Sequence, residues 1–200
     1  MFKQFKIQVN IPTFISHNGQ TASPLNTYAK RMKELSAKRK KTDADHEQMA
    51  KFEFEAGLYL NDAREVIIPG RLFEALIAEG AKKSKEGKIA LSSTFVDTDA
   101  VISYDGGPLS VEELTKSDFH RLSVPVRIGQ ARVLRTRPIF KNVKAEWIVS
   151  LQTEVANQAQ LQRWITDGMN LVGVGDWRPR HGRGVVTVFE EIVVPLTAVA

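Results

Sequence analysis

The sequence predicts an α+β fold, and three observations lead to that prediction. Several segments alternate apolar and polar residues with a period of two, which is typical of half-buried strands. Two other segments place apolar residues at helical spacing. Once two irregular stretches are set aside, the segments follow the order strand, helix, strand, strand, helix, strand. That order indicates a ferredoxin-like core of the βαββαβ type.

The first half of the chain contains three predicted strands. Every second residue is apolar in Phe5–Ile11, and apolar residues alternate again in Phe52–Leu60. A short apolar run at Val66–Ile68 is typical of a buried strand. Because Phe52–Leu60 is surplus to the βαββαβ order, we expect it to join the sheet edge or to pair within an insertion.

That insertion is predicted from about residue 20 to about residue 60. Apolar residues at helical spacing predict a helix after Asn26, and Thr42 with Asp45 three residues later forms an approximate capping box for a second helix. Lys30–Lys41 contains seven basic residues and one acid. This charge indicates either a solvated helix face or a contact with nucleic acid.

The clearest predicted helix of the core begins at Pro69–Gly70 and carries Leu72, Phe73, Leu76 and Ile77 on one face. The lysines near its end are interpreted as favourable partners of the helix dipole. A strand is predicted over Thr94–Tyr104. After it comes a thumb-like excursion from about residue 105 to about residue 122, with one helical turn that begins at Ser110 and has Glu113 at the capping-box position.

The second half of the chain returns to strands. Val124–Ile128 and Ala131–Phe140 are predicted to be extended, with Gly129 marking a bulge or bend. Arg127 and Arg135 are expected to share one face of this extended chain, and Arg132 the other. Further predicted elements are a strand around Trp147–Leu151, a helix around Leu161–Val172 with Trp164 in the core, and a final strand over Val185–Val194.

Composition limits the classes of protein. The chain has 200 residues, enough for a single domain over residues 1–200, and a formal net charge of +5, which favours contact with polyanions. It contains no cysteine, so disulfides, thiolate metal sites and cysteine catalysis are excluded. Without a long apolar run or an apolar N-terminal stretch, we expect a cytoplasmic protein that does not contact membranes.

The segment Leu171–Ile192 carries the strongest functional signal. Arginine provides a rigid fork of donors for phosphate, tryptophan provides a flat face for stacking, and glycine permits close approach of another backbone. The glycines lie between a predicted helix and a strand, so they form neither a dinucleotide fingerprint nor a Walker loop. The alternative is a long turn with solvated arginines. The residues concerned are Gly173, Gly175, Trp177, Arg178, Arg180, His181, Gly182, Arg183 and Gly184.

A catalytic role would require a general base and a general acid. His181, His120 and Tyr104 are the candidates for metal-independent RNA cleavage. The alternative is that all three are structural or surface residues, and we expect no enzyme activity. Asp97 and Asp99 would share a strand face, but no third ligand stands at a recognisable spacing. We therefore expect neither a metal nor a cofactor.

Two motifs resemble the RAMP superfamily of CRISPR RNA-binding proteins, whose core is RRM-like. VGVGDWRPRHGRGVV (Val172–Val186) is similar to the C-terminal glycine-rich loop of that superfamily, although Arg183 stands where an aromatic residue is usual. IPGRLFEALI (Ile68–Ile77) resembles the opening of the first helix in backbone (Cas seven-type) subunits. These subunits polymerise along a guide RNA and carry a helical insertion and a thumb-like hairpin.

The resemblance implies non-catalytic, largely sequence-independent binding of single-stranded RNA by a reduced backbone-type subunit, which would form homo-oligomers or join other subunits. Three alternatives remain: a single-stranded DNA-binding or anti-CRISPR protein of a phage, a CRISPR RNA-processing endoribonuclease, and a protein-interaction domain. The candidate nucleic-acid contacts are Arg178, Arg180, Arg183, Trp177, Gly175, Gly182, Arg127, Arg132, Arg135, Arg137, Lys38, Arg39 and Lys40.

Overall fold

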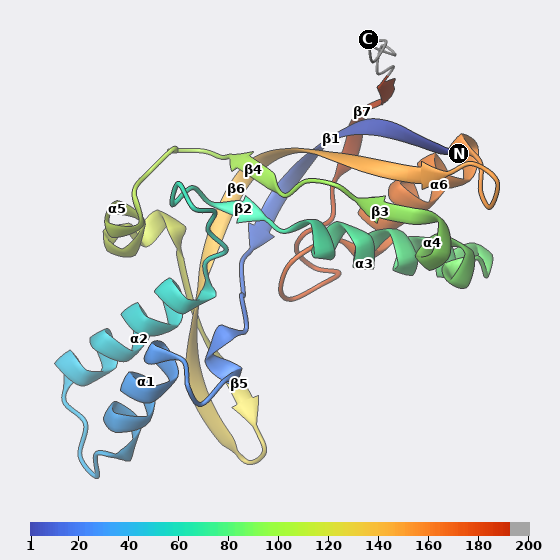
Figure 1. The fold of residues 1–200 in the computed structure, drawn as a ribbon. Helices are drawn as coiled ribbons and strands as arrows, with labels where there is room; N and C mark the ends of the chain where they lie inside the picture. The colour runs from blue at the N-terminus through green and yellow to red at the C-terminus, as the bar shows by residue number, and fades with distance from the viewer. Residues whose placement is uncertain (193–200) are drawn as a thin grey trace.

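The structure is a computed structural model that describes residues 1–192, and it combines helices with one antiparallel sheet (Figure 1). The strands lie in the order β2-β4-β6-β1-β7, and β3 and β5 also pair with β6. The mixture of helices with an antiparallel sheet agrees with the predicted α+β class. The strands are β1 (Phe2–Ile15), β2 (Ile67–Ile68), β3 (Thr94–Val96), β4 (Ala100–Ser103), β5 (Arg121–Ile128), β6 (Ala131–Gln152) and β7 (Val185–Ile192).

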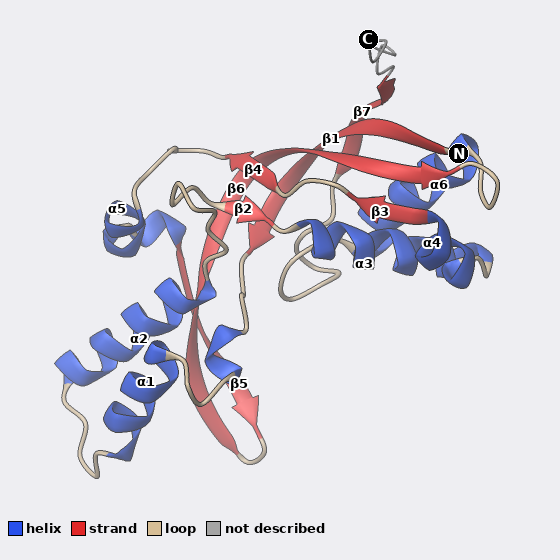
Figure 2. Cartoon of the chain, in the orientation of Figure 1, coloured by secondary structure: helices blue, strands red, loops and turns tan. Residues whose placement is uncertain are grey.

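Helices gather on one face of the sheet (Figure 2). The alternating apolar residues of β1 and β6 point toward these helices and are fully buried, and the Phe73 ring of α3 stacks on Trp147 of β6 with 3.8 Å between centroids. Trp164 of α6 is also buried, as expected. The α-helices are α1 (Thr27–Ala37), α2 (Asp43–Gly57), α3 (Gly70–Ala81), α4 (Gly87–Ser93), α5 (Val111–Lys116) and α6 (Gln158–Asp167).

Short helical turns complete the described chain. Three are 3₁₀ turns, at Gln20–Ala22, Lys82–Ser84 and Asp118–His120, and one is a π-helical turn at Gly168–Val172. Within residues 1–192, no helix has the length and apolar character needed to cross a membrane.

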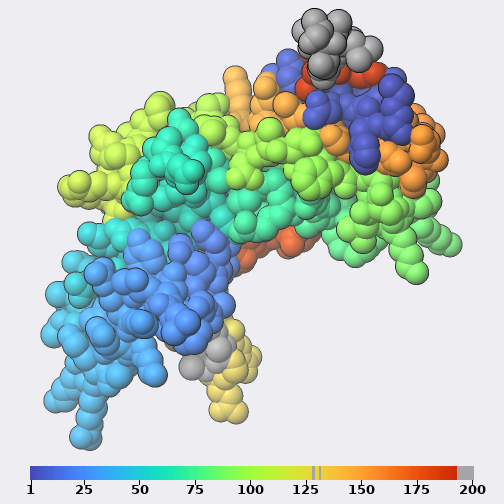
Figure 3. All heavy atoms as spheres, in the orientation of Figure 1, coloured from blue at the N-terminus to red at the C-terminus, as the bar shows by residue number. Residues whose placement is uncertain are grey.

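A protrusion stands away from the sheet and consists of α1, α2 and the hairpin of β5 with the first part of β6 (Figure 3). The two helices lie within the predicted insertion. As predicted, a capping box starts α2: the Thr42 hydroxyl accepts from the Asp45 backbone N–H, and the Asp45 carboxylate accepts from the Thr42 backbone N–H.

The long ribbon of β1 and β6 changes its buried side halfway along. In β6 the buried residues are at odd positions from Val143 to Leu151, but at even positions from Thr136 to Phe140. Asn142 lies between the two sets with a left-handed φ of 49°, which asparagine tolerates better than most residues. The register pairs Ile11 with Val143 and then Thr13 with Lys141, so Pro12 of β1 lies at the same point.

The strand predicted over Phe52–Leu60 is wrong, because most of it belongs to α2. Phe52 and Phe54 are separated by about 200° on a helix, so they point to opposite sides. Both are buried, since Phe52 packs against Tyr28 of α1 while Phe54 lies in the main core. A helix that is covered on two sides therefore reproduces the alternation of a strand.

The prediction for residues 94–104 is only partly right, because β3 and β4 are separate strands. Residues 97–99 leave the ladder between them, and their side chains make local bonds. Asp99 Oδ1 accepts from the backbone N–H of Gly70 at 2.7 Å, and Asp97 accepts from the Ser150 hydroxyl. Asp99 therefore stabilises the start of α3, and Asp97 is bonded to the sheet.

The projecting hairpin also differs from the prediction. Of the two predicted alternatives for Gly129, a bulge or a bend, the structure has the bend, because this residue, with φ 60°, lies in the turn between β5 and β6. Arg127 therefore lies directly opposite Arg132 on one face, and Arg135 lies opposite Val124 on the other face. The 105–122 excursion holds α5 where a helical turn was predicted, and its capping box from Ser110 and Glu113 is confirmed. Residues 193 and 194 of the predicted last strand lie outside the described residues.

Glu86 ties the segment after α3 to α6, and its contribution to stability should depend on pH. Its carboxylate accepts bonds from Ser84, from the Trp164 indole N–H, from Gln160 and from Arg163, which lower its pKa to about 2. A depressed carboxyl pKa stabilises the fold above the usual carboxyl pKa, and this stabilisation is lost as pH falls toward 2. We expect thermal unfolding of E86Q to depend less on pH between 5 and 2 than that of the parent.

Candidate nucleic-acid interface

The glycine-rich loop, Gly173–Gly184, is fastened to the end of β1. The backbone N–H of Gly182 donates to the Thr13 carbonyl at 2.8 Å, and the N–H of Asp176 donates to the Ile15 carbonyl at 2.9 Å. The Val174 N–H donates to the Gly182 carbonyl and closes the loop on itself. The backbone is therefore held at both ends of the loop, and the His181 N–H, which donates to the Trp177 carbonyl, closes the turn between them.

The glycines of this loop serve packing inside the protein. Gly173, Gly175 and Gly182 have φ values of 82°, 85° and 79°, which disfavour side chains. A Cβ added to Gly175 would overlap the Ile15 carbonyl oxygen, and one added to Gly182 would overlap the Val174 carbonyl oxygen. Close approach of another backbone, the predicted reason for these glycines, therefore occurs with β1 and within the loop itself.

The loop presents its three arginines outward. Arg178, Arg180 and Arg183 are exposed, and none forms an ion pair or a side-chain hydrogen bond with any residue of the described range 1–192. Arg178 is close enough to Glu79 to help lower the pKa of that carboxyl, after the larger effect of Lys82. Donors on a fixed backbone with unneutralised charge are suited to bind phosphate oxygens.

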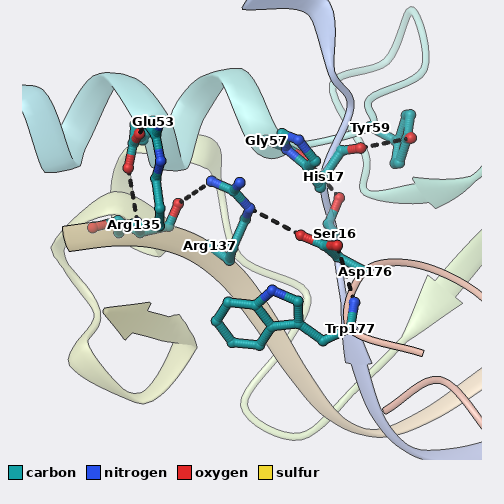
Figure 4. A network of polar contacts seen from close by, with 10 residues as sticks. Ser16, His17, Glu53, Gly57, Tyr59, Arg135, Arg137, Asp176 and Trp177 are labelled. Carbon is teal, nitrogen blue, oxygen red and sulfur yellow. Dashed lines mark hydrogen bonds and ion pairs between the residues drawn. The ribbon is translucent and has the colours of Figure 1, made fainter. Parts of the chain in front are cut away.

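Trp177 lies at the base of the loop, half-buried, with a left-handed φ of 54°. A bulky residue rarely adopts this conformation, and strain of this kind often marks binding sites. Figure 4 places its indole ring beside Arg137 and β6. The side chain of Asp176 accepts from the Trp177 N–H at 3.0 Å, which holds this turn in shape.

Arg137 and Arg135, both predicted contacts, are engaged within the protein (Figure 4). The Arg137 Nε donates to Asp176 Oδ2 at 3.1 Å and its Nη1 donates to the Thr136 carbonyl, so the arginine joins the hairpin to the loop. Arg135 pairs with Glu53 of α2, which also accepts from the backbone N–H of Thr136. These two arginines therefore position the hairpin between α2 and the loop.

His17 lies in the same junction. Burial, and then the charge of Arg137, lower the pKa of His17, so its ring is neutral near pH 7. Tyr59 donates from its hydroxyl to the His17 carbonyl at 2.9 Å, and Ser16 donates to the Gly57 carbonyl at 2.7 Å. No local pattern in the sequence indicates this junction, because its partners are up to 83 positions apart.

The remaining predicted contacts are on the protrusion. Arg127 and Arg132 face the same side at the hairpin tip and are exposed. Arg39 and Lys40 are exposed in the connection between α1 and α2, whereas Lys38 pairs with Asp45 at 2.6 Å. The predicted basic residues therefore occupy two places, the glycine-rich loop and the protrusion.

The three candidate catalytic residues do not form one site. The rings of Tyr104 and His120 are in contact, with 5.3 Å between centroids, and His120 is 1% exposed with Nδ1 bonded to the Ile139 carbonyl. His181 belongs to the loop, near Trp177. Burial lowers the pKa of both histidines and raises that of Tyr104. A neutral histidine is a base, and Tyr104 keeps its proton beside His120, but His120 is buried and His181 belongs to a different element.

The face of the sheet opposite the helices carries both signs of charge, together with the exposed rings of Phe2 and Phe95. Lys6 pairs with Glu190, and Gln8 donates to Glu146. The central strands place Gln4, Lys144 and Ile148 on this face between those residues. Acids that lie among the bases weaken attraction for phosphate, so this face is a poorer candidate than the loop.

Comparison of the sequence with protein-family models and with curated proteins gives no match.

The pair of Arg137 and Asp176 should contribute to stability. Replacing Asp176 with alanine leaves Arg137, whose side chain is 13% exposed, without its carboxylate, and also frees the Trp177 N–H. We expect D176A to lower the free energy of unfolding by about 2 kcal/mol, below the cost at a fully buried pair. Urea denaturation measures this. E112A, which removes the exposed pair with Lys116, should cost less than about 0.5 kcal/mol.

Proposed function

We propose that the protein binds single-stranded RNA, largely without regard to sequence, and that it is a non-catalytic subunit of the backbone type that assembles along the strand. One observation carries this function: Arg178, Arg180 and Arg183 project from a loop whose backbone is fastened to β1, and none of them forms an ion pair within residues 1–192. Single-strand binding without sequence preference combines such a positive surface with aromatic faces. Trp177 supplies the aromatic ring beside them.

The arrangement of the strands supports a ferredoxin-like core for this function. The elements β1, α3, β3 with β4, β6, α6 and β7 follow the βαββαβ order, and their strands lie in the sheet order β4-β6-β1-β7. Single-strand binders of the RRM type place aromatic rings on the central strands of the open face. Here Lys6, Gln8, Lys144 and Glu146 lie along the middle of that face, and the exposed rings of Phe2 and Phe95 lie near the start of β1. Because acids stand among these bases, the loop is favoured as the phosphate contact.

Salt-dependent binding tests this function. Fluorescence anisotropy of a labelled 30-nucleotide RNA, measured from 50 to 300 mM salt, should give an affinity that falls steeply. Each phosphate contact with a single strand contributes about −0.7 to the slope of log K against log salt, so three contacts predict a slope of about −2 or steeper. The number of proteins bound should rise with RNA length if subunits assemble along the strand.

Matched DNA and metal-free reactions separate the alternatives. Equal or tighter binding of a DNA oligonucleotide would indicate a single-stranded DNA-binding protein instead. Cleavage of the RNA in the presence of a chelator, abolished in H181A, would indicate an endoribonuclease. The absence of salt-sensitive binding to either polymer would contradict the proposed function and leave a protein-interaction domain.

A further inference from the structure

A cavity of about 370 Å³ lies in the protrusion, between α1, α2 and the hairpin. Its apolar lining comes from Met32 of α1, Met49 and Ala50 of α2, and Val133 and Leu134 of β6. Pockets for small molecules usually begin at about 300 Å³ and are mainly apolar with few polar groups. The cavity therefore has the size and the lining of a ligand site.

The space between these elements is not filled by the protein. Within α1, which is fully described, only Leu35 is buried, although the helix is fixed at its start by Asn26. Met32 and Met49 are half-buried, and Leu134 is 56% exposed. Leaving apolar side chains partly in water loses the free energy that their burial would contribute. A flat apolar ligand would cover them, and methionine adapts well to such surfaces.

The rim of the cavity is basic. Lys41 donates to the Lys38 carbonyl, which leaves its charge unneutralised, and Arg132 has no ion-pair partner among the described residues. Glu53 is the one acid of the lining, and Arg135 already pairs with it. The exposed Arg39 and Lys40 directly precede Lys41 in the same connection. The rim therefore favours a ligand that carries an anionic group next to the part that enters the apolar interior.

We propose that this cavity is a nucleotide pocket, which takes one base of the bound strand and holds its phosphate with Lys41 and Arg132. An apolar interior with a cationic rim matches a nucleotide, whose planar base carries an anionic phosphate. Unpaired bases of a single strand can be splayed out in this way. In naming a nucleotide as the ligand, this inference rests on the nucleic-acid binding proposed above. It adds a second contact that is distinct from the glycine-rich loop.

The four methionines provide a direct test. In protein labelled with ¹³C at the methionine methyl groups, Met32 and Met49 lie in the pocket, whereas Met1 is at the N-terminus and Met169 is buried in the main core. Addition of AMP should shift the Met32 and Met49 methyl signals saturably, through the ring current of the base, and leave Met169 in place. Ribose 5-phosphate has no aromatic ring and should cause no comparable shift.

Two variants test whether AMP binds in the cavity. A50F fills the interior and should abolish the shift of Met32 by AMP, while an unchanged Met169 signal reports that the core is folded. The double variant K41Q/R132Q should weaken AMP binding about tenfold but leave adenosine binding unchanged, because only the phosphate contacts are lost. Methyl signals that do not respond to AMP, that respond equally to ribose 5-phosphate, or that still respond in A50F would overturn the pocket. So would a response to a fatty acid or an apolar peptide in place of AMP.

The loop variant R178A/R180A/R183A separates this site from the proposed function. It should keep the AMP response of Met32 and Met49. If RNA binding is lost in that variant but the parent shows no AMP response, the pocket fails and RNA binding by the loop stands. If AMP moves the methyl signals but the parent does not bind RNA, the proposed function fails and a site for free nucleotides remains.

Discussion

Replacing Arg178, Arg180 and Arg183 together with alanine is expected to lower the affinity for single-stranded RNA about 100-fold. Each lost phosphate contact costs about 1 kcal/mol, so three contacts cost about 3 kcal/mol. The slope of log K against log salt should become shallower by about 2, because three contacts of about 0.7 each are removed. Stability should hardly change, since these side chains are exposed and unpaired within the described residues.

The control must remove the same charge from another surface. K6A/K88A/K144A also removes three positive charges, two of them from the open face of the sheet and one from α4. We expect the affinity of this variant for RNA to lie within about threefold of that of the parent, because salt screens the interaction of distant charges with the RNA. If both triple variants lose affinity equally, net charge rather than the loop governs binding. If the control alone loses affinity, the strand lies on the sheet.

Replacing Gly182 with alanine is expected to lower the free energy of unfolding by about 3 kcal/mol or more. Its left-handed φ of 79° costs about 1–2 kcal/mol for any L-residue with a side chain. In addition, the new Cβ would overlap the Val174 carbonyl, so the backbone must shift and break the bonds of Gly182 with Thr13 and Val174. RNA affinity should fall with stability, because the arginines lose their fixed platform.

Gly129 is the matched control for the steric part of this effect. It also has a left-handed φ, 60°, but no atom lies within 4 Å of a Cβ added there. G129A should therefore cost about 1–2 kcal/mol, from the backbone conformation alone. Urea denaturation of both variants measures the difference. Equal costs for the two would mean that Gly182 is not packed against Val174 as described.

The sequence predicts the fold correctly where an element depends on residues that are close together in the chain. The capping boxes that start α2 and α5 use residues three positions apart, so the sequence contains both partners. The apolar face of α3 was likewise visible as a periodic pattern. The long strand β6 was recognised in two parts only, because Asn142 reverses its alternation at midlength.

Long-range packing was not predictable in the same way. The helix around Phe52–Gly57 looked like a strand, because nothing local indicates that α1 and the core cover it on opposite sides. Arg135 and Arg137 looked like free cations, yet their partners, Glu53 and Asp176, are 82 and 39 positions away. The arginines that are exposed on the loop form no ion pair with an acid among the described residues.

The reversal of the buried side at Asn142 and Pro12 has a consequence for how this chain tolerates changes of length. The two halves of the β1–β6 ribbon, on either side of Asn142 and Pro12, bury opposite faces. One half buries the face toward α3 and α6, and the other buries the face toward α2. Insertion of one residue in either half would turn its apolar row outward, whereas an inserted pair preserves it. Each strand of the hairpin can therefore gain residues two at a time without a change in the side that its apolar residues face. The domain that carries the hairpin is not disturbed by such insertions.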